Sequence, residues 1–525
     1  MKFNNIYKRY LPVVCLALSM TAVSCIDESD NINPNEVTED MMQADNLKTG
    51  SLFQQMQRYV IVVPFAGDDG NEGSSSYQVV QYLSHDLFSG YAGSTLGSVT
   101  NHNQYIWMDN WVSGTFEVGF TRVMGGWKDL HEAAMAQGNE EIAALADIVK
   151  VAGMHRIADS FGPIPYVNYG SSNEYDALDV VYKKFFEELD NAIDVLSDYA
   201  SVGGSLMSKY DLVYGGNATN WVKFANTLRL RLAMRVYYAD RALAQAEVAK
   251  CMACPQGFVE TKNERPEVST TLLTYEYPIY KIAYDFNDGD GRPGASIVEI
   301  MKQFNDPRLS NYFTAVNGEY HGVPIGIRGS INRYQTECSN YNNMSLYGTP
   351  IVWMYAAESF FLRAEAALYG MNVGGDAKTF YESGISASCE EHGVSVGSYL
   401  SSQARLGSYT NNVESYTYSF KSNATPAWDD AADTEGKLER IITQKWIAMF
   451  PEGGEGWAEQ RRTGYPDLIN IMTNGSNGTI DSNLGPRRMP YPLNEKVNNA
   501  AGVASGVSKL GGPDNGGTKL WWDKK

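Results

Sequence analysis

The sequence predicts a mainly α-helical protein in which pairs of helices stack into an α-α superhelical scaffold, with long irregular loops and a few short strands. Apolar residues recur at spacings of three and four along several segments, which is the period of a helix that buries one face. Strand-like alternation is confined to short pieces, such as residues 275–286. The helical periodicity covers residues 40–63, 115–136, 140–159, 178–199 and 219–239.

A later pair of predicted helices is the most informative. Residues 356–369 stop at Gly370 and residues 376–392 stop at Gly393, and a glycine just past the last apolar position is a helix stop signal. Small alanine side chains in the first helix and a Gly-Gly turn before the second make the unit similar to a tetratricopeptide repeat. Repeats of this kind stack because each covers its neighbour's apolar face.

Long segments without helical periodicity separate the helices. Unusually long loops in a compact domain are often functional, because binding residues tend to lie on loops that a rigid scaffold holds in place. We therefore expect ligand-binding residues in these insertions. They cover residues 64–114, 251–295, 314–349 and 393–433.

The N-terminus has the layout of a signal peptide. Basic residues at positions 2, 8 and 9 precede an apolar stretch at 11–23, which is shorter than the roughly 20 residues of a membrane-spanning helix. Small residues then lead to Cys25, as at the cleavage site of a lipoprotein. We predict a lipoprotein signal peptide at 1–24 and lipidation of Cys25; an ordinary secretory signal with an incidental cysteine is the alternative.

A polar stretch follows the predicted anchor. Residues 25–39 are rich in Asp, Glu and Asn and lack apolar periodicity, which is typical of a flexible tether. Residues 40–525 contain no long low-complexity segment, and their length fits one large domain or two fused ones. We predict a single domain.

Charge and composition restrict the partners. The formal net charge of -19 becomes -22 when the three basic residues of the signal peptide are removed, so nucleic acid is not an expected partner. The 34 Tyr and 10 Trp favour a surface that stacks on rings, which suits sugars and peptides alike. Four cysteines remain beyond Cys25, too few for a disulfide scaffold.

A GxGxxG pattern at residues 289–294 lies between a strand-like and a helix-like run. Asp285, Asp288 and Asp290 would face the phosphates of a bound nucleotide, and no second strand with a ribose-binding acid follows, so we reject a nucleotide site. The same aspartates leave two alternatives, a solvated turn and a calcium site, although their spacing does not match an EF-hand loop.

Two further patterns are weak. A GxSxG pattern at 393–397 follows a helix and not a strand, so we interpret Gly393 as a helix cap and not as part of a hydrolase nucleophile turn. Cys251 and Cys254 form a CxxC pair, and Cys389 with His392 forms CxxH. A local disulfide or buried reduced thiols is the preferred interpretation, and a shared zinc ion is the alternative.

No catalytic group stands out. His85, His131 and His155 are isolated from any marked nucleophile, and a glycosidase carboxylate pair is defined by distance in space and not by spacing in sequence. We therefore predict a binding protein and not an enzyme, with no catalytic residue, no metal and no cofactor.

Several segments taken together carry a family resemblance. They are NPN at 33–35, HRIADSFGPIPY at 155–166, WVKFANTLRLRLAMR at 221–235, NDPRL at 305–309, the helix pair at 356–392, TQKW at 443–446, EQRRTGYP at 459–466 and RRMPYP at 487–492. In this order they resemble the SusD/RagB family of nutrient-binding outer-membrane lipoproteins, in its SusD-like branch. We interpret their arginines as scaffold residues that pair with buried acids, and the Gly-Pro segment as a rigid bend with Tyr166 packed beneath it.

The resemblance implies a location and partners. A family member would be a tetratricopeptide-like scaffold tethered by a lipid to the outer membrane at the cell surface, lying over a SusC-like TonB-dependent transporter. It would act as a lid and as a receptor for a nutrient, an oligosaccharide or a peptide. The acidic residues after Cys25 also resemble the export mark of such surface lipoproteins.

Aromatic side chains in the insertions are the predicted ligand platform, because ring faces stack on sugars and on peptide side chains. The chosen residues are Tyr105, Trp107, Tyr334, Tyr341 and Tyr347. Two other functions remain open: a surface glycosidase of the same uptake system, and a non-catalytic adhesin or assembly subunit.

Overall fold

The computed structural model describes residues 47–64, 76–95, 101–286, 289–329 and 331–525. Residues 49–525 form one compact unit. The predicted signal peptide, Cys25 and the tether lie outside the described residues, so their assignment stays a prediction.

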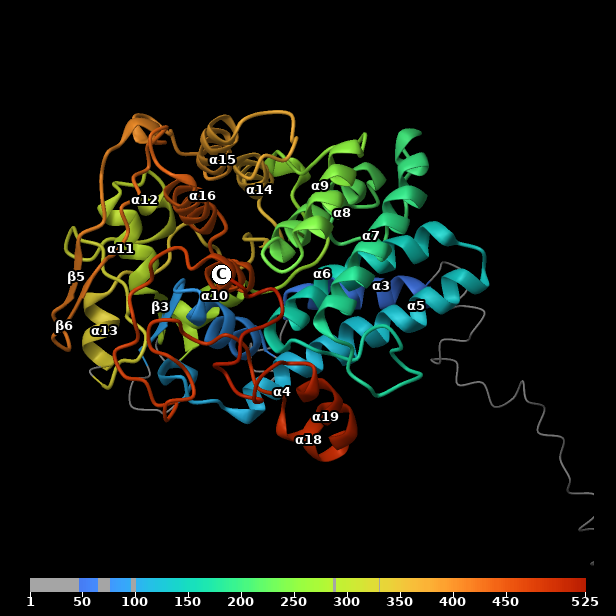
Figure 1. Ribbon diagram of the computed structural model, residues 1–525, viewed down its shortest axis with the longest axis horizontal. Helices are drawn as coiled ribbons and strands as arrows, with labels where there is room; N and C mark the ends of the chain where they lie inside the picture. Colours follow the sequence, from blue (N-terminus) through green and yellow to red (C-terminus); the bar gives the residue numbers. More distant parts are fainter. Residues whose placement is uncertain (1–46, 65–75, 96–100, 287–288, 330) are drawn as a thin grey trace, which may run out of the picture. The chain divides into compact units, whose positions relative to one another are not determined.

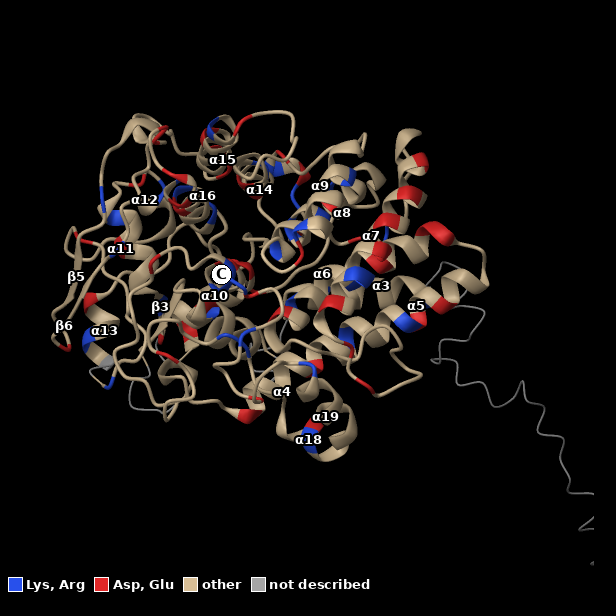
Figure 2. Cartoon of the chain, in the orientation of Figure 1, with Lys and Arg blue, Asp and Glu red and all other residues tan. Residues whose placement is uncertain are grey.

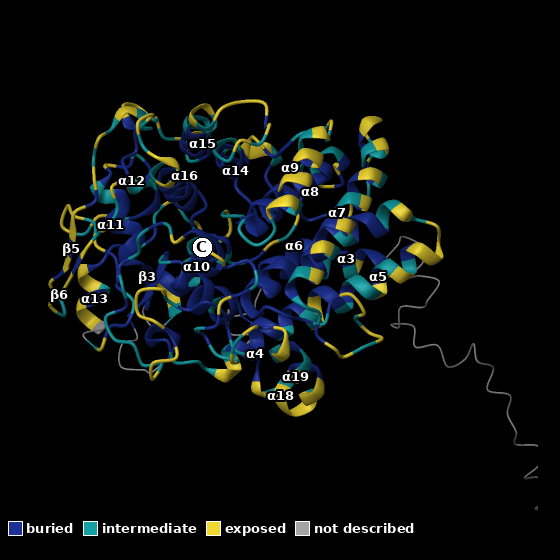
Figure 3. Cartoon of the chain, viewed as in Figure 1, coloured by how far each residue is buried: buried dark blue, intermediate teal, exposed yellow. Residues whose placement is uncertain are grey.

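The prediction of a mainly helical protein is confirmed. In the first half of the chain, helices that follow one another in sequence pack against one another, from α5 through α9 (Figure 1). Buried residues run along α6 and α8, which lie inside this stack (Figure 3). The helices are α3 (Leu47–Val60), α4 (Asp109–Glu117), α5 (Gly125–Ala136), α6 (Glu140–Phe161), α7 (Leu178–Ser201), α8 (Ala218–Val236) and α9 (Arg241–Ala253).

One helix of this stack, α9, was not predicted. Its start is fixed by Asp240, whose side chain accepts a hydrogen bond from the backbone N–H of Leu243. Its apolar positions Ala244, Val248 and Cys251 are buried against α8, spaced three and four residues apart. Alanines occupy much of the helix, so its apolar stripe is faint in the sequence.

A second helical group lies in the C-terminal half. Helix α14 (Ala356–Leu368) packs against α15 (Ala377–Glu391), as the sequence predicted, and also against α16 (Thr434–Ala448) and α8. The ring of Phe361 comes so close to Gly384 that a Cβ there would lie 2.8 Å from it. This close approach explains the small residue at the crossing of α14 and α15. Helix α17 (Gly453–Thr463) follows α16.

The strands are short and form three antiparallel pairs. They are β1 (Ala92–Ser94) with β3 (Gly291–Pro293), β2 (Glu267–Val268) with β4 (Ile351–Val352), and β5 (Ser408–Asn411) with β6 (Tyr416–Ser419). The first two pairs join segments far apart in sequence, and only the third is a local hairpin.

The remaining helical pieces are η3 (Gln78–Asp86), η4 (His102–Gln104), η5 (Val118–Met124), η6 (Lys262–Glu264), α11 (Ala295–Gln303), α12 (Leu309–Tyr312), α13 (Ile331–Glu337), η9 (Tyr399–Ser401), α18 (Leu493–Asn498) and α19 (Ala500–Ser508).

The predicted strand at 275–286 is wrong. This segment forms α10 (Pro278–Tyr280) and η7 (Lys281–Asp285). Pro278 occupies the first helical turn, where its fixed φ is compatible with a helix and its missing N–H costs nothing. Within this segment Tyr277, Tyr280 and Tyr284 are spaced three and four apart, which is a helical spacing.

The structure accounts for the two glycine patterns. Gly393 has φ +65° and its N–H donates to the carbonyl of Glu390, so it ends α15 as predicted. In the 289–294 pattern, residues 291–293 are strand β3, and the N–H groups of Gly294 and Ala295 at the start of α11 donate to the carbonyls of Tyr91 and Val323. These N–H groups are therefore already used inside the protein.

Arginines of α8 pair with buried acids, as predicted. Arg231 donates from Nε and Nη2 to the two carboxylate oxygens of Glu358 at 2.8 and 2.6 Å. Arg229 donates from Nε to Glu247 at 2.7 Å, and Arg235 pairs with Glu455. These contacts fix α8 to α9, α14 and α17. Exposed acids instead lie along α7, where Figure 2 shows them in red.

The predicted bend after α6 is also present. Gly162 ends the helix with φ +89°, and Tyr166 is buried below it with its hydroxyl donating to Glu188. Arg488 holds the bend by donating to the carbonyl of Phe161 at 3.0 and 2.9 Å.

Cys251, Cys254, Cys338 and Cys389 are free thiols. In the part of the chain that the structure describes, no helix is both long enough and apolar enough to span a membrane.

Candidate ligand-binding site

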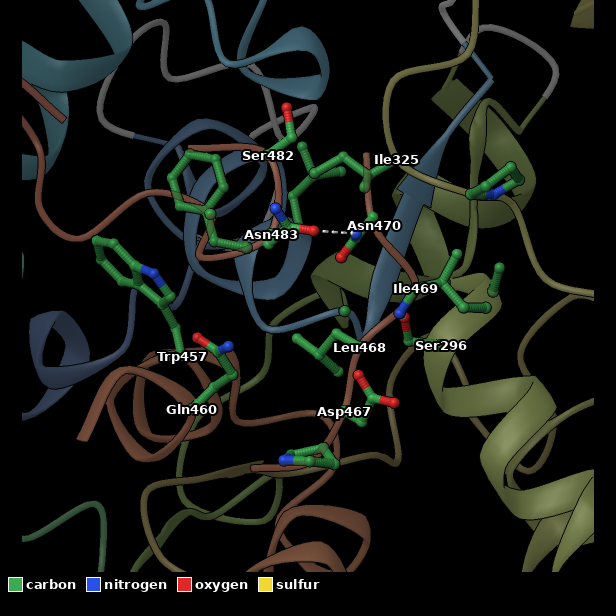
Figure 4. Close-up of a pocket in the computed structure, with 18 of the residues that line it drawn as sticks. Ser296, Ile325, Trp457, Gln460, Asp467, Leu468, Ile469, Asn470, Ser482 and Asn483 are labelled. Atoms are coloured by element: carbon green, nitrogen blue, oxygen red, sulfur yellow. Dashed lines mark hydrogen bonds between the residues drawn. The ribbon is translucent and has the colours of Figure 1, made fainter. Parts of the chain in front are cut away.

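A surface pocket lies where α17 meets β1, the start of α11 and three loops (Figure 4). The loops contribute residues 323–325, 466–470 and 482–486. Its labelled lining residues are Ser296, Ile325, Trp457, Gln460, Asp467, Leu468, Ile469, Asn470, Ser482 and Asn483 (Figure 4).

The polar groups of this pocket are partly engaged with one another. The Nδ2 of Asn470 donates to the Oδ1 of Asn483 at 2.8 Å, the dashed contact in Figure 4. The carboxylate of Asp467 accepts from the hydroxyl of Tyr418 at 2.6 Å and from the backbone N–H of Lys421 at 2.5 Å. The pocket therefore offers mainly neutral amide and hydroxyl groups.

The pocket is small. Its volume is about 90 Å³, whereas sites that enclose a whole small molecule have volumes of about 300 to 1,000 Å³. A ligand bound here would insert one group, with the rest of the molecule outside.

A second surface feature consists of three tyrosines, Tyr280, Tyr284 and Tyr347, which we call the tyrosine ledge. The rings of Tyr280 and Tyr284 lie 4.8 Å apart between centroids. The backbone N–H of Tyr277 donates to the carbonyl of Leu346 at 2.7 Å, which holds the loop of Tyr347 beside α10. Among the described aromatic side chains, Tyr284 and Tyr347 are the exposed ones, at 40% and 57%.

Charged groups border the tyrosine ledge. The hydroxyl of Tyr347 donates to Glu276 at 3.0 Å, and Lys281 bridges Glu276 and Asp285, at 3.1 Å from each. The hydrogen bond to Glu276 raises the pKa of Tyr347, and partial burial raises the pKa of Tyr284. Both phenols therefore stay protonated at neutral pH and present neutral rings with polar edges.

Two of the five predicted ligand residues lie inside the protein. Tyr341 is 2% exposed, and its hydroxyl bonds to that of Tyr82 at 2.9 Å and donates to the carbonyl of Arg292 at 3.1 Å. Tyr334 is fully buried and its hydroxyl accepts from Asn411 at 2.7 Å. The faces of these two rings are covered by protein in this structure.

The other three predicted residues are closer to the surface. Tyr347 belongs to the tyrosine ledge, and Tyr105 lines the pocket at α17. Trp107 is half-buried and packs on Phe88 and His102, at 5.7 and 5.1 Å between ring centroids. The five side chains thus lie in different places, and ligand contact through any of them remains a prediction.

Tyr280 and Tyr284 were not among the predicted ligand residues, because residues 275–286 were expected to form a strand. Their spacing of four residues was the available signal, since it places both rings on one face of a helix. The lining of the pocket by residues 457–486 carried no comparable signal, because it depends on where these loops fold back.

The described lining of the pocket contains one carboxylate, that of Asp467. Glycosidases use two carboxyl groups that flank the bond to be cleaved. Among the described residues, no three or more His, Cys, Asp and Glu side chains are grouped so that they could hold a metal ion.

Comparisons with known proteins agree with this architecture. The family model described as SusD and RagB outer membrane lipoprotein matches residues 29–523. A chitin-binding SusD homologue from Flavobacterium johnsoniae is 38% identical, with a TM-score of 0.84 over 91% of this chain and 98% of that chain. A SusD homologue from Bacteroides vulgatus is 34% identical, with a TM-score of 0.85 over 92% and 99%.

A comparison with the curated proteins found no match. The family match covers most of the chain, and the helical scaffold superposes on solved members of the family. The chain therefore belongs to the SusD-like family of outer membrane lipoproteins.

Proposed function

We propose that the protein is a cell-surface receptor that captures a glycan on the tyrosine ledge. The observation that carries this proposal is the pair of rings of Tyr280 and Tyr284, 4.8 Å apart, with Tyr284 and Tyr347 exposed at the surface. Sugar rings stack on such faces, and nearby carboxylates accept hydrogen bonds from sugar hydroxyls. The 38% identical homologue that binds chitin supports a glycan over a peptide.

In this proposal the protein is held to the outer membrane by lipidated Cys25. It covers a SusC-like TonB-dependent transporter as a lid and passes the glycan to it. Membership of a family of outer membrane lipoproteins supports this arrangement. Copurification of a large outer-membrane transporter with the protein from detergent-solubilised membranes is the expected result.

Binding without catalysis is part of the same proposal. Two observations support capture over hydrolysis. The one described carboxylate in the pocket is already bonded to Tyr418 and Lys421, and the two carboxylates beside the tyrosine ledge, Glu276 and Asp285, are both paired with Lys281. Incubation with a panel of glycans should release no shorter product, and turnover of any of them would favour the glycosidase alternative. An adhesin or assembly subunit would bind a protein partner but no oligosaccharide.

Alanine substitutions test the tyrosine ledge. Tyr284→Ala and Tyr347→Ala should each weaken binding of chitohexaose about tenfold, because loss of a stacked ring costs on the order of 1 to 1.5 kcal/mol. Titration calorimetry on the soluble mature protein measures this. Tyr347→Phe keeps the ring and should keep most of the affinity.

Leu493→Ala on α18, an exposed apolar residue outside both features, is the control and should bind like the unchanged protein. Unaltered affinity in both alanine variants would contradict the placement of the site. Binding of a peptide digest without binding of any glycan would contradict glycan capture.

A further inference from the structure

Tyr105, in the pocket at α17, has an unusual backbone. It follows η4 with φ 58° and ψ 31°, in the left-handed region. A bulky residue rarely adopts this conformation, which costs of the order of 1 kcal/mol or more and persists where the surrounding structure imposes it. Backbone strain of this kind is concentrated at binding sites.

The hydroxyl of Tyr105 is also unusual. The residue is 7% exposed, yet its hydroxyl makes no hydrogen bond with any residue that the structure describes. The hydroxyl faces the loop of Gly485, where an added Cβ would lie 3.3 Å from it. The hydroxyl oxygen is not among the described side-chain atoms that are buried without a partner, so it is a free hydrogen-bonding group that a ligand can reach on the pocket wall.

Gln460, on α17, supplies a second free group. Its side chain is half-buried and lines the pocket, and within the described chain its amide forms no hydrogen bond (Figure 4). Trp457, one turn earlier on the same helix, is fixed by its indole N–H, which donates to the carbonyl of Pro486 at 2.7 Å. The helix thus holds Gln460 beside the loop at 482–486.

The remaining lining determines the kind of group that fits. The formal charges of Asp467 and Lys421 cancel, so the pocket has no net charge and favours a neutral ligand over a carboxylate or a phosphate. Half-buried apolar side chains of Ile325 and Leu468 form part of the wall. The volume of about 90 Å³ is well below the roughly 300 Å³ of a site that encloses a whole small molecule, so one small group fits. An acetamido group, with one methyl, one N–H and one carbonyl, matches this size and chemistry.

We propose that this pocket is a second ligand subsite, separate from the tyrosine ledge, which takes the acetamido group of an N-acetylated sugar. The Tyr105 hydroxyl donates to the acetamido carbonyl, Gln460 accepts from its N–H, and the methyl lies against Leu468 and Ile325. This inference rests on the proposed capture of a glycan. The sugar ring itself stays outside the pocket, where it is linked to the rest of the oligosaccharide.

Two glycans with the same backbone test the subsite. Chitohexaose carries acetamido groups where cellohexaose carries hydroxyls, and both are neutral. The unchanged protein should bind chitohexaose about tenfold more tightly, as expected for two hydrogen bonds made only by the acetamido group. Tyr105→Phe and Gln460→Leu should each remove most of this preference and leave the affinity for cellohexaose unchanged.

Folding is monitored in the same samples. Tyr105→Phe should leave the thermal midpoint unchanged, because the lost hydroxyl has no partner in the protein. Tyr199→Phe, at the end of α7 and outside the pocket lining, is the matched control and should keep the preference for chitohexaose.

The outcomes separate the two proposals. Equal affinity for both glycans, or a preference that survives in both pocket variants, would overturn the acetamido subsite while leaving the tyrosine ledge intact. Binding of neither glycan would overturn glycan capture and the subsite together. If an N-acetylated peptide bound in this pocket with the same affinity as chitohexaose, the pocket would recognise a peptide amide, and the proposal of an N-acetylated sugar would be overturned.

Discussion

At the scale of single residues, burial separates the tyrosines into two groups with different roles. Tyr82 and Tyr341 share a hydrogen bond inside the protein, and burial raises the pKa of both well above the usual range. They are neutral structural groups that hold β3 through the carbonyl of Arg292. Tyr284 and Tyr347 are exposed and have rings that a ligand can reach. Residue type alone does not distinguish the two groups.

His102 shows the same effect of burial on an ionisable group. It is fully buried, its Nδ1 lies 3.1 Å from the carbonyl of Leu83, and burial lowers its pKa from 6.5 to about 3. As the pH falls, the unfolded chain therefore binds a proton at this residue before the folded one does. Its contribution to stability is fully present above about pH 6.5 and is lost progressively between that pH and about pH 3.

The variant His102→Asn should reduce this acid sensitivity. Between about pH 7.5 and pH 5, the free energy of unfolding of the unchanged protein should fall by about 2 kcal/mol more than that of the variant. Urea unfolding at the two pH values measures the difference. Because each protein is compared with itself at the two pH values, the effect of the smaller side chain on stability cancels. Parallel pH dependence in the two proteins would contradict the assignment.

At the scale of elements, buried ion pairs fix α17, the helix that carries Trp457 and Gln460. Arg462 on α17 donates to both carboxylate oxygens of Glu365 on α14, at 2.7 Å each, and also binds Glu459 at 2.6 Å. These groups have almost no exposure to solvent. The pocket therefore depends on an electrostatic contact on the far side of the helix that lines it.

Removing one partner should be costly. Arg462→Met leaves buried carboxylates without their cation, and we expect it to lower the free energy of unfolding by about 3 to 5 kcal/mol. Arg333→Met, in the exposed pair of Arg333 with Glu337, should change it by less than about 1 kcal/mol. Urea unfolding of both variants tests this.

The double variant Arg462→Met with Glu365→Met is the decisive comparison. It removes the charge and one of its buried partners together, so it should recover part of the stability lost in Arg462→Met. If Arg462→Met and Arg333→Met lowered the free energy of unfolding by similar amounts, the buried ion pair would not be what holds α17.

At the scale of the whole molecule, the proposed role requires attachment to a membrane at one end of the chain. Cys25→Ser should release the protein from the membrane fraction while the folded unit at 49–525 keeps its thermal midpoint. Cell fractionation measures release from the membrane, and mass spectrometry of the mature N-terminus measures lipidation. A variant that stays in the membrane fraction would contradict the anchor.

Much of the helical scaffold was predictable, because helix periodicity and stop signals are local. Helices α6, α7, α8, α14 and α15 appear where the apolar spacing placed them. The arginines of α8 were also interpretable, since a buried guanidinium must find an acid whichever helix supplies it. The prediction of a strand at 275–286 was wrong because a short run rich in apolar residues fits both the spacing of a strand and that of a helix.

The sequence by itself determined the helical class and the need of the α8 arginines for acidic partners, because each follows from local spacing or from the chemistry of one side chain. The signal peptide and the anchor at Cys25 stay predictions from the sequence. Only the tertiary structure decided which tyrosines are covered and which are exposed. Tyr341 is buried by contacts with Tyr82 and β3, and the pocket around Tyr105 is closed by loops more than 200 residues further along the chain. Exposure is a property of such long-range packing, so no local pattern in the sequence encodes it.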